Sequence, residues 1–559
     1  MDNNEIADQL SLLGKLMEIH GDNSFKAKTY LSAAFAIEQL PNSIATLSPN
    51  KIFSLKGVGE SVGKKVLEMI EDGELTALKE YLEKTPAGVL EMMNIKGLGP
   101  KKIHTIWKEL GIDTVDGLQQ ACTENRIAEK KGFGEKTQQK ILDALNFQEQ
   151  NQGKLLYAQV EAFAESFTEK LREHFPDSQM QLTGEFRRQL EVICKLEWVT
   201  TAPKADLLKF LDRQDFTPVY DTESELVVNL QQRINLYFYF TNNEGLVQLL
   251  FETSSSDEFL SAFRKHHQMH SNFPHSEEEI FEQAGIAFIP PFLRESETIL
   301  TKAVKGSMFS NVLQTNEVKG LIHAHSDWSD GGYSIEAMAE ELISLGFEYL
   351  VISDHSKAAY YAGGLTEQRI KEQHRYVDEL NRRFAPFRIF KSIECDILSD
   401  GALDYSNEVL STFDLVIASI HSNLDMDKEK AMKRLIGAIT NPYVTILGHM
   451  TGRRLLSRKA YPVDFPLVID ACAENKVVIE INANPNRLDM DWRWIDYALQ
   501  KGVMLSVNPD AHTIEEFHNI RYGVLVAQKG GLTKESNLSS MNLAQFETYL
   551  NNRKQQRFR

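Results

Sequence analysis

Short apolar runs alternate with longer amphipathic stretches throughout the C-terminal 240 residues of the chain. Seven runs predict strands, near residues 320–323, 349–353, 388–394, 414–420, 444–448, 477–482 and 503–508. The stretches between them predict helices, for example over 334–345, 367–384, 428–439 and 463–474. Because strand and helix alternate, the seven units predict a parallel, closed and slightly irregular (β/α) barrel, with its active face at the carboxyl ends of the strands.

Histidines and carboxylates stand at the ends of these predicted strands. The set comprises His323, His325, Asp330, His355, Glu394, His421, His449, Asp510 and His512. His323 and His325 are two residues apart, and alternation along a strand lets such a pair face one cavity. Side chains at the strand ends of a barrel converge on one mouth, so the pattern predicts a site for several metal ions. The set contains no cysteine, which favours Mn²⁺, Zn²⁺ or Fe²⁺ without choosing among them.

Three Lys-Gly-x-Gly turns mark the first 150 residues, at 56–59, 96–99 and 131–134, and each precedes a predicted helix, over 61–70, 101–109 and 136–145. Paired glycines permit a tight turn whose backbone N–H groups approach a phosphate, while the next helix points its positive end the same way. The residues assigned to DNA are Lys56, Gly57, Gly59, Lys64, Lys96, Gly97, Gly99, Lys101, Lys102, Lys131, Gly132, Gly134 and Lys136. Three basic turns in succession predict sequence-independent binding of the DNA backbone. The alternative is a helical domain whose hairpins only pack against one another.

The middle of the chain has a third pattern. Alternating residues at 226–230 and 234–240 predict half-buried strands. The adjacent prolines at 290–291 are expected to end a helical pattern and to lead the chain, extended, into a connector over about 296–319.

Length and charge narrow the class of protein. A chain of 559 residues exceeds what one hydrophobic core organises, which predicts three or more structural units. The net charge of -18 excludes indiscriminate nucleic-acid binding by the whole surface, so any such contact is local. The four cysteines lack metal-like or disulfide-like spacing, which fits a reducing compartment. No apolar run reaches the length of a membrane span and the N-terminus does not resemble a signal peptide, so we expect a cytoplasmic protein.

The basic turns and the strands of the middle region also carry a resemblance. Residues 1–300 resemble family X DNA polymerases. The resemblance implies a lyase-type helix-hairpin-helix domain at 1–80, a fingers-like one at 81–150, a nucleotidyltransferase-like α+β palm at 151–250, a thumb-like region at 251–300 and a connector at 301–319. It implies gapped, nicked or 3′-ended DNA as the partner. Lys65 matches the lysine that forms a Schiff base with an abasic sugar in this family, although a simple phosphate contact is the alternative.

The palm departs from the family's pattern where nucleotide addition takes place. The segment 182–191 resembles the family's Gly-Ser-x-Arg-Arg segment, but Glu185 replaces the serine and would repel a triphosphate. The family's Asp-x-Asp pair reads Lys195-Leu196-Glu197, and Asn235 stands where the third carboxylate is expected. Two divalent cations need these carboxylates for in-line phosphoryl transfer. The sequence therefore predicts a palm that persists as a scaffold without polymerase activity.

Residues 320–559 resemble the polymerase and histidinol phosphatase (PHP) domain that follows the polymerase in bacterial family X proteins. The resemblance implies that the nine side chains above hold three divalent ions, with Glu394 bridging two and Asp354 supporting the site from outside. It implies hydrolysis of a phosphoester by a metal-activated water, with His449 or Arg453 acting on the departing oxygen.

These features together predict a multidomain, DNA-binding, metal-dependent phosphoesterase that acts in DNA repair. The activity expected first is that of a 3′–5′ exonuclease or DNA end-processing enzyme. Three alternatives remain: a working gap-filling polymerase with a proofreading PHP domain, a repair scaffold with two silent sites, and a phosphatase of small molecules.

Overall fold

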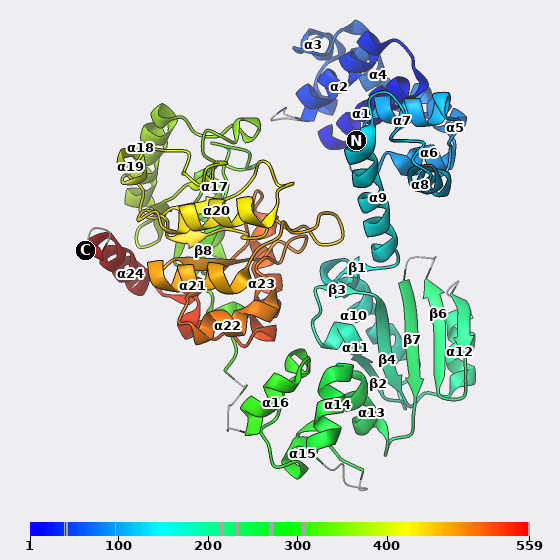
Figure 1. Cartoon of the computed structure of the whole chain (residues 1–559), viewed down its shortest axis with the longest axis vertical. Coiled ribbons are helices and arrows are strands. Elements are labelled where there is room, and N and C mark those ends of the chain that lie inside the picture. Colours follow the sequence, from blue (N-terminus) through cyan, green and yellow to red (C-terminus); the bar gives the residue numbers. More distant parts are fainter. Residues whose placement is uncertain are drawn as a thin grey trace. The chain divides into compact units, whose positions relative to one another are not determined.

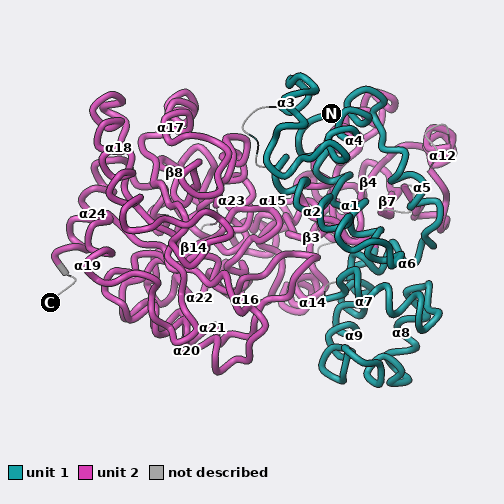
Figure 2. Tube along the Cα trace, turned by 90° about the horizontal axis from the view of Figure 1, so that it is seen from above, with its two compact units in different colours: residues 1–152 teal, residues 153–559 magenta. Residues whose placement is uncertain are grey.

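The computed structural model describes residues 1–38, 40, 43–95, 97–212, 216–230, 234–267, 273–304, 309 and 311–556, so Lys96 lies outside the described residues. The chain divides into two compact units, residues 1–152 and 153–559, which Figure 2 colours separately. Within the described ranges, no helix combines the length and the apolar content that crossing a lipid bilayer requires.

Unit 1 is built from helices that share one apolar cluster, which extends from Ile6 to Leu145. The helices are α1 (Asn3–His20), α2 (Ser24–Glu38), α3 (Pro49–Ser54), α4 (Glu60–Asp72), α5 (Thr76–Lys84), α6 (Ala87–Met92), α7 (Pro100–His104), α8 (Val115–Thr123) and α9 (Gly134–Asn151). The helices predicted after the three basic turns are confirmed as α4, as α7 with the π-helical turn Thr105–Glu109, and as α9.

The three turns share one way of attaching to this core. In each, the residue between the glycines is buried, and its N–H donates to the carbonyl three residues earlier at 3.0 or 3.1 Å. These anchoring residues are Val58, Leu98 and Phe133. The glycines on either side are exposed, and the first glycine of each turn has a φ of 88°, 93° or 96°, a backbone conformation that glycine adopts without strain. In the third turn the second glycine, Gly134, is also left-handed, at a φ of 70°.

Unit 2 begins with an α+β region on a five-stranded sheet in the order β2-β4-β7-β6-β5. The strands are β2 (Met180–Thr183), β4 (Lys195–Thr200), β5 (Thr217–Asp221), β6 (Glu225–Leu230) and β7 (Ile234–Phe240), while β1 (Leu155–Leu156) pairs with β3 (Val192–Ile193). β4 and β7 are parallel and the other neighbours in the sheet are antiparallel. Helices α10 (Tyr157–His174) and α12 (Lys204–Asp212) pack on the sheet through one apolar cluster, and α11 (Gly184–Arg187) follows β2. The strands predicted at 226–230 and 234–240 are confirmed.

Four helices follow the sheet: α13 (Leu246–Thr253), α14 (Asp257–His266), α15 (Glu277–Gln283) and α16 (Glu297–Val304). The prediction of a connector from residue 296 is wrong for its first part, because α16 buries Leu300 and Ala303 in the same apolar cluster as α14 and α15. The extended path predicted at the two prolines is found at Pro290, with a φ of -58° and a ψ of 150°, but not at Pro291, which begins a 3₁₀ turn, Pro291–Leu293. A proline suits the first position of such a turn, where its missing N–H costs nothing.

The rest of unit 2 combines parallel strands with helices and is coloured from green to red in Figure 1. The strands are β8 (Gly320–Ala324), β9 (Tyr349–Ile352), β10 (Arg388–Lys391), β11 (Glu394–Asp396), β12 (Ile417–Ser419), β13 (Ile446–Leu447), β14 (Val478–Asn482) and β15 (Leu505–Asn508). They form two parallel sheets, β10-β9-β8 and β11-β12-β13-β14-β15. Parallel bridges between Ala324 and Ala511, and between His355 and Glu394, join the sheets into a barrel. All seven predicted runs are strands, and the run 388–394 is broken into β10 and β11.

The helices of the barrel lie between these strands in the sequence, except the last two, which follow β15. They are α17 (Ile335–Ser344), α18 (Glu367–Phe384), α19 (Asn407–Leu410), α20 (Lys428–Ile439), α21 (Phe465–Asn475), α22 (Ile495–Gln500), α23 (Ile520–Lys529) and α24 (Leu543–Gln556). The four predicted helices correspond to α17, α18, α20 and α21.

Polar contacts inside unit 2 join the barrel to the α+β region. The Lys529 ammonium at the end of α23 is buried and donates to Glu295 Oε1 at 2.6 Å and to the Arg188 carbonyl at 2.8 Å. Trp492 Nε1 donates to Glu191 Oε2 at 3.0 Å, and Tyr522 donates to Glu161 at 3.1 Å. These contacts fix the barrel to α10, to the segment that leads from α11 to β3, and to the stretch directly before α16.

A buried ion pair holds the helices after the sheet together. The Arg294 guanidinium is fully buried, bonds to Glu277 and lies 5.1–5.6 Å from the rings of three phenylalanines. Arg187 bonds to the other oxygen of Glu277. Burial raises the pKa of Glu277, but the two arginines outweigh it and hold that pKa below its usual 4.5. A carboxyl whose pKa is lowered by folding stabilises the folded protein at any pH above the pKa that the carboxyl has in the unfolded chain. This contribution is lost as the pH falls through the lowered pKa.

Replacing Glu277 by Gln is expected to destabilise unit 2 by about 3 kcal/mol, because a buried guanidinium loses its counter-charge. Urea unfolding followed by tryptophan fluorescence measures the change. The difference from the wild type should shrink as the pH is lowered below 4.5, where the wild-type carboxyl takes up a proton. Glu252→Gln, which removes an exposed ion pair with Arg264, is the matched control and should cost less than about 1 kcal/mol. Equal stability of both variants at neutral pH would contradict the assignment.

Candidate metal centre

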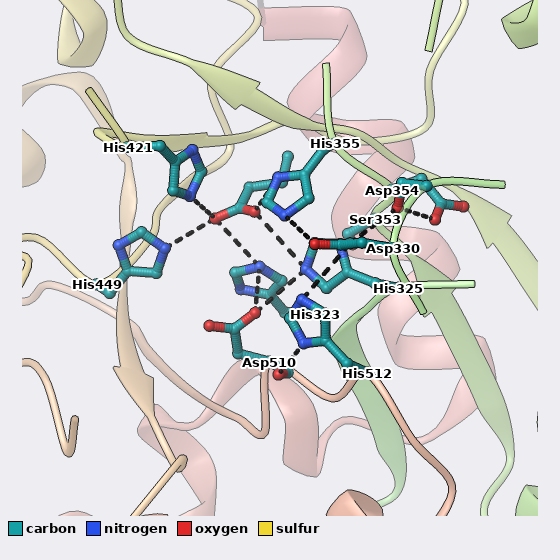
Figure 3. A network of polar contacts seen from close by, with 12 residues as sticks. His323, His325, Asp330, Ser353, Asp354, His355, His421, His449, Asp510 and His512 are labelled. Atoms are coloured by element: carbon teal, nitrogen blue, oxygen red, sulfur yellow. Dashed lines mark hydrogen bonds and ion pairs between the residues drawn. The ribbon is translucent and has the colours of Figure 1, made fainter. Parts of the chain in front are cut away.

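The loops at the carboxyl ends of the barrel strands bring the predicted ligands together. Figure 3 shows the rings of His323, His325, His355, His421, His449 and His512 converging with the carboxylates of Asp330 and Asp510. Three of these residues have a left-handed backbone, with φ values of 68° at His323, 21° at His449 and 53° at Asp510. Residues other than glycine adopt this conformation at a cost of about 1–3 kcal/mol, which the surrounding structure must offset. The backbone is therefore shaped to point side chains into this mouth.

The Glu394 carboxylate lies at the centre of the cluster. Its Oε1 is 2.8 Å from His449 Nε2, 3.1 Å from His421 Nε2 and 3.3 Å from His323 Nε2. Its Oε2 is 3.0 Å from His355 Nδ1 and 3.6 Å from His325 Nε2. Five imidazoles from the ends of four strands, β8, β9, β12 and β13, thus surround one buried carboxylate.

Three groups of side chains each have ligand atoms within 4.8 Å of one another. The groups are His325, Asp330, His355 and His512; His323, His325, Glu394 and Asp510; and His355, Glu394 and His421. His325, His355 and Glu394 each belong to two groups, so the groups are adjacent. His449 belongs to none of them and reaches the cluster through Glu394. All nine predicted residues are thus brought together.

Several polar atoms in this mouth are buried without a hydrogen-bond partner among the described residues. They are His323 Nε2, His325 Nδ1, His355 Nδ1, Glu394 Oε2, His421 Nδ1 and His449 Nδ1. A buried polar atom without a partner costs on the order of 1–3 kcal/mol, so such a cluster is unfavourable unless something else binds it. Imidazole nitrogens and carboxylate oxygens are ligands for divalent transition metals. The donor set therefore fits divalent metal ions.

The surroundings of the cluster shift the pKa values of its histidines in opposite directions. Burial and the neighbouring His512 and His355 lower the pKa of His325 to about 3. Burial also lowers the pKa of His421, but the Glu394 and Asp396 carboxylates outweigh it and raise that pKa to about 10. The pKa of Glu394 is held well below its usual value, since the positive charge of nearby histidines outweighs burial. Carboxylates in this mouth are thus ionised and attract positive charge, which a divalent ion supplies while displacing protons from histidine.

A second layer of polar residues holds the ligands, and the sequence analysis missed its main member. The buried Glu480 of β14 accepts from His323 Nδ1 at 2.6 Å and from the His449 backbone N–H at 3.1 Å. Asn508 donates to Glu480 at 2.8 Å and Asn482 donates to Asp510 at 3.0 Å. A glutamate in the middle of the apolar run Val-Ile-Glu-Ile-Asn was the signal available in the sequence. Such contacts fix the orientation of metal-binding histidines.

Asp354 and Asp396 also support the ligands from outside. Asp354 is fully buried and accepts from the Ser326 N–H and hydroxyl, both at 2.8 Å, and from Gln373 at 2.7 Å. These contacts hold the loop between His325 and Asp330. Asp396 Oδ1 is 3.3 Å from His421 Nδ1. Asp354 thus holds the loop that carries ligands, Asp396 contacts the ligand His421 itself, and neither carboxylate belongs to one of the three groups.

Two arginines near the mouth have different surroundings. The Arg453 guanidinium, predicted to act on the departing oxygen, donates to Asp491 Oδ2 at 3.0 Å and to the Arg487 carbonyl at 2.9 Å. These contacts tie it to the loop after β14 and away from the ligands. Arg487, which the sequence analysis did not single out, has its Nε 3.6 Å from Asp510 Oδ2. Arg487 is therefore the arginine whose side chain reaches the cluster.

A different arrangement surrounds the positions that the resemblance matches to the family's polymerase carboxylates. Lys195 of β4 lies opposite Asn235 of β7, and its ammonium is 2.7 Å from Glu197 Oε1. Tyr239 donates to the same oxygen at 2.9 Å, and the Glu185 N–H donates to Glu197 Oε2 at 3.1 Å. Both oxygens of this carboxylate thus accept hydrogen bonds or an ion pair from the chain itself, whereas Glu394 Oε2 accepts no hydrogen bond among the described residues.

The remaining predicted residues belong to unit 1. Lys65 is half-buried on α4, and its neighbour Lys64 is exposed and forms an ion pair with Glu60 at 2.8 Å. Lys102 donates to the Gly97 carbonyl at 3.1 Å, and Lys101 is exposed. The other predicted DNA contacts are exposed at the first and third turns: Lys56, Gly57 and Gly59, and Lys131, Gly132, Gly134 and Lys136.

Comparison with known proteins matches two family models to unit 1 and finds phosphatases that match part of the chain. Residues 1–75 match the family model described as a helix-hairpin-helix domain, and residues 89–146 match one described as a SAM-like helix-hairpin-helix tandem. A probable phosphatase of Thermoanaerobacter sp. (strain X514) is 26% identical over 249 residues, which is 42% of this chain and 94% of that protein. A probable phosphatase of Caldanaerobacter subterraneus subsp. tengcongensis is 32% identical over 171 residues, which is 29% of this chain and 60% of that protein.

One relative spans nearly the whole chain. The protein named DNA polymerase/3′-5′ exonuclease PolX of Bacillus subtilis (strain 168) is 31% identical over 572 residues, which cover 98% of this chain and 99% of that protein. The resemblance of the first 300 residues to family X polymerases and that of the barrel to the domain that follows them are thus parts of one full-length similarity. The chain belongs to the bacterial family X DNA polymerase/3′–5′ exonuclease (PolX) family.

Proposed function

We propose that this chain is a DNA-binding, metal-dependent phosphoesterase that shortens or cleans DNA 3′ ends during repair, as a 3′–5′ exonuclease, and that its polymerase core is inactive. The observation that supports this proposal most strongly is the set of buried, unpaired ligand atoms around Glu394. The relative from Bacillus subtilis is named a 3′-5′ exonuclease, and the shorter relatives are named probable phosphatases, so all of these names imply cleavage of phosphoesters.

The barrel is proposed to be of the PHP type and to hold three divalent ions, Mn²⁺, Zn²⁺ or Fe²⁺. The nine ligands would be shared among the three groups, with Glu394 between two of them. When bound, such ions supply a water of lowered pKa and neutralise charge on the phosphoryl oxygens. The chain's own residues orient this chemistry. Glu480 holds His323 and the backbone of His449, and Arg487 beside Asp510 offers a positive charge to a phosphate at the mouth. Arg453 is reassigned as a positioning residue, because Asp491 and two backbone carbonyls occupy its guanidinium.

The palm is proposed to be a scaffold. Lys195 supplies, from within the chain, the positive charge that metal ions supply in a working polymerase, and Glu197 has no free oxygen left for an ion. Binding two cations there would require breaking these contacts and bringing an ammonium close to the ions. A working polymerase is for this reason the second choice.

The three turns of unit 1 are proposed to bind the DNA backbone without reading its sequence. Their anchoring residues are buried and their glycines are exposed, so each turn presents backbone N–H groups to solvent from a fixed position. The DNA partner is proposed to be gapped, nicked or 3′-ended.

Removing a ligand is expected to abolish hydrolysis together with metal binding. Glu394→Gln and His323→Ala should each slow Mn²⁺-dependent shortening of a 5′-labelled oligonucleotide by about 100-fold or more. Both should also lower the metal content measured by inductively coupled plasma mass spectrometry. The matched control is His518→Ala, which removes an exposed histidine of the same barrel. Shortening that persists in both variants and in chelator would point to a contaminating nuclease and would end the proposal.

Nucleotide addition is expected to be absent. The test uses the Glu394→Gln variant on a gapped primer–template with all four deoxynucleotides and Mn²⁺ or Mg²⁺, because a protein that cannot shorten the primer cannot hide its extension. The Bacillus subtilis relative, which is named a DNA polymerase, is the positive control. Metal-dependent extension of the primer would show that Lys195 does not block the palm.

Adding a methyl group to an exposed turn glycine tests the DNA contact. At Gly59 and Gly99 the φ values are -75° and -82°, and a Cβ would meet nothing within 4 Å, so alanine should leave the fold unchanged. If a phosphate lies against these turns, the double variant Gly59→Ala, Gly99→Ala should bind DNA about 10-fold more weakly at the same melting temperature. Fluorescence anisotropy with a gapped duplex gives the affinity. Lys79→Ala, on α5, is the control. Unchanged affinity in the double variant would move the DNA contact away from the turns.

A further inference from the structure

Two adjacent tyrosines beside the candidate metal centre have no assigned role. Tyr360 and Tyr361 are 85% and 64% exposed, and large aromatic side chains are seldom left so open without a partner. They form the 3₁₀ turn Tyr360–Ala362 at the tip of the loop between His355 and Leu365. Their ring centroids are 5.9 Å apart, with an interplanar angle of 79°.

Both ends of this loop are fixed at the cluster. The loop begins directly after His355, and the Leu365 N–H donates back to the His355 carbonyl at 2.8 Å. The Ser356 N–H donates to the Glu394 carbonyl at 3.0 Å. The Tyr405 hydroxyl accepts from the Lys357 N–H at 3.1 Å and donates to the Leu365 carbonyl, which closes the base of the loop.

The tip of the loop is also held close to the ligands. The backbone bends at Gly363, which has a φ of 68°, and a Cβ there would lie 3.2 Å from the carbonyl oxygen of Ser329, the neighbour of Asp330. The loop therefore presents two aromatic faces in a fixed position at the edge of the mouth.

We propose that Tyr360 and Tyr361 form a stacking platform for the last bases of a single-stranded DNA 3′ end whose terminal phosphodiester lies at the metal centre. The proposal rests on the proposed function. An aromatic ring stacks on any base, because every base has a π-face, so the platform suits an enzyme that removes nucleotides without regard to sequence. Bases can meet the two rings only when they are unpaired. The platform would therefore select frayed or single-stranded ends over fully paired ones.

A fixed platform also reduces the entropic cost of binding. A flexible loop would have to be ordered when DNA binds, whereas this loop is already held by backbone hydrogen bonds at its base. The neighbouring positive charge of Arg487, beside Asp510, is available to the phosphate, so base and phosphate would be recognised by separate groups.

The kinetic test compares wild type with the double variant Tyr360→Ala, Tyr361→Ala on a single-stranded oligonucleotide in Mn²⁺. The KM should rise about 10-fold or more, while kcat changes by less than about 3-fold, because stacking positions the DNA and takes no part in hydrolysis. The double variant Tyr360→Phe, Tyr361→Phe should keep the wild-type KM, since the rings remain. The control Tyr220→Ala removes a 52% exposed tyrosine of β5 in the palm and should have no effect.

A second substrate separates stacking from a structural role of the loop. An oligonucleotide whose last two nucleotides lack bases cannot stack, so wild type and the alanine variant should hydrolyse it with the same, raised KM. A variant that raises the KM equally for both substrates would overturn the proposal, and so would a variant with the wild-type KM. If the wild type hydrolyses no DNA end at all, the proposed function fails instead.

Cross-linking gives a readout that needs no hydrolysis. An oligonucleotide with phosphorothioate linkages and 5-iodouracil as its last base, irradiated with the full chain in Mn²⁺, should attach to the tryptic peptide 358–369, which contains both tyrosines. The phenylalanine variant should attach and the alanine variant should not. Attachment only to other peptides would place the 3′ end elsewhere and would overturn the proposal. The same result is expected if the two tyrosines bind a partner protein instead of DNA.

Discussion

The barrel of this chain depends on balancing the charge of one buried carboxylate. Glu394 has no exposed surface, yet its carboxylate is ionised and is surrounded by five imidazoles from four strand ends. An ionised group in a medium of low dielectric constant is stable only when opposite charge or hydrogen-bond donors are close. Histidines can supply part of that charge by taking up protons, but only by holding several positive rings within a few ångströms of one another. A divalent ion supplies the same charge in one place and lets the rings remain neutral.

The buried carboxylate of the α+β region is balanced by the chain itself and not by a cluster of histidines. There the carboxylate of Glu197 is neutralised by the ammonium of Lys195 and by two hydrogen bonds, so no unpaired oxygen remains. The chain itself supplies every partner of the Glu197 carboxylate. Around Glu394, by contrast, several ligand atoms have no hydrogen-bond partner among the described residues. This contrast, rather than the presence of acidic residues alone, distinguishes a region suited to structure from a region suited to chemistry.

The fold and most of the site could be predicted because they depend on local pattern. Seven apolar runs and the histidines at their ends follow directly from the alternation of strand and helix, and the glycine turns follow from backbone conformations that other residues avoid. The missed features depend on long-range contacts. In the sequence, Glu480 is a single charged residue within an apolar run. Only the fold brings His323, 157 residues away, against it. The role first given to Arg453 followed its position after His449, whereas the loop after β14 captures its guanidinium. Helix α16 was missed because eight residues give a weak periodic signal.

The contacts of Lys529 and Trp492 with the α+β region have a consequence for how this protein can be divided. The ammonium of Lys529 is enclosed by a carbonyl and a carboxylate from outside the barrel, and the Trp492 indole has its partner in Glu191. A barrel cut free at its first strand would expose both side chains and leave them without these partners. The α+β region is thus a covering wall for the barrel, whatever other role it has.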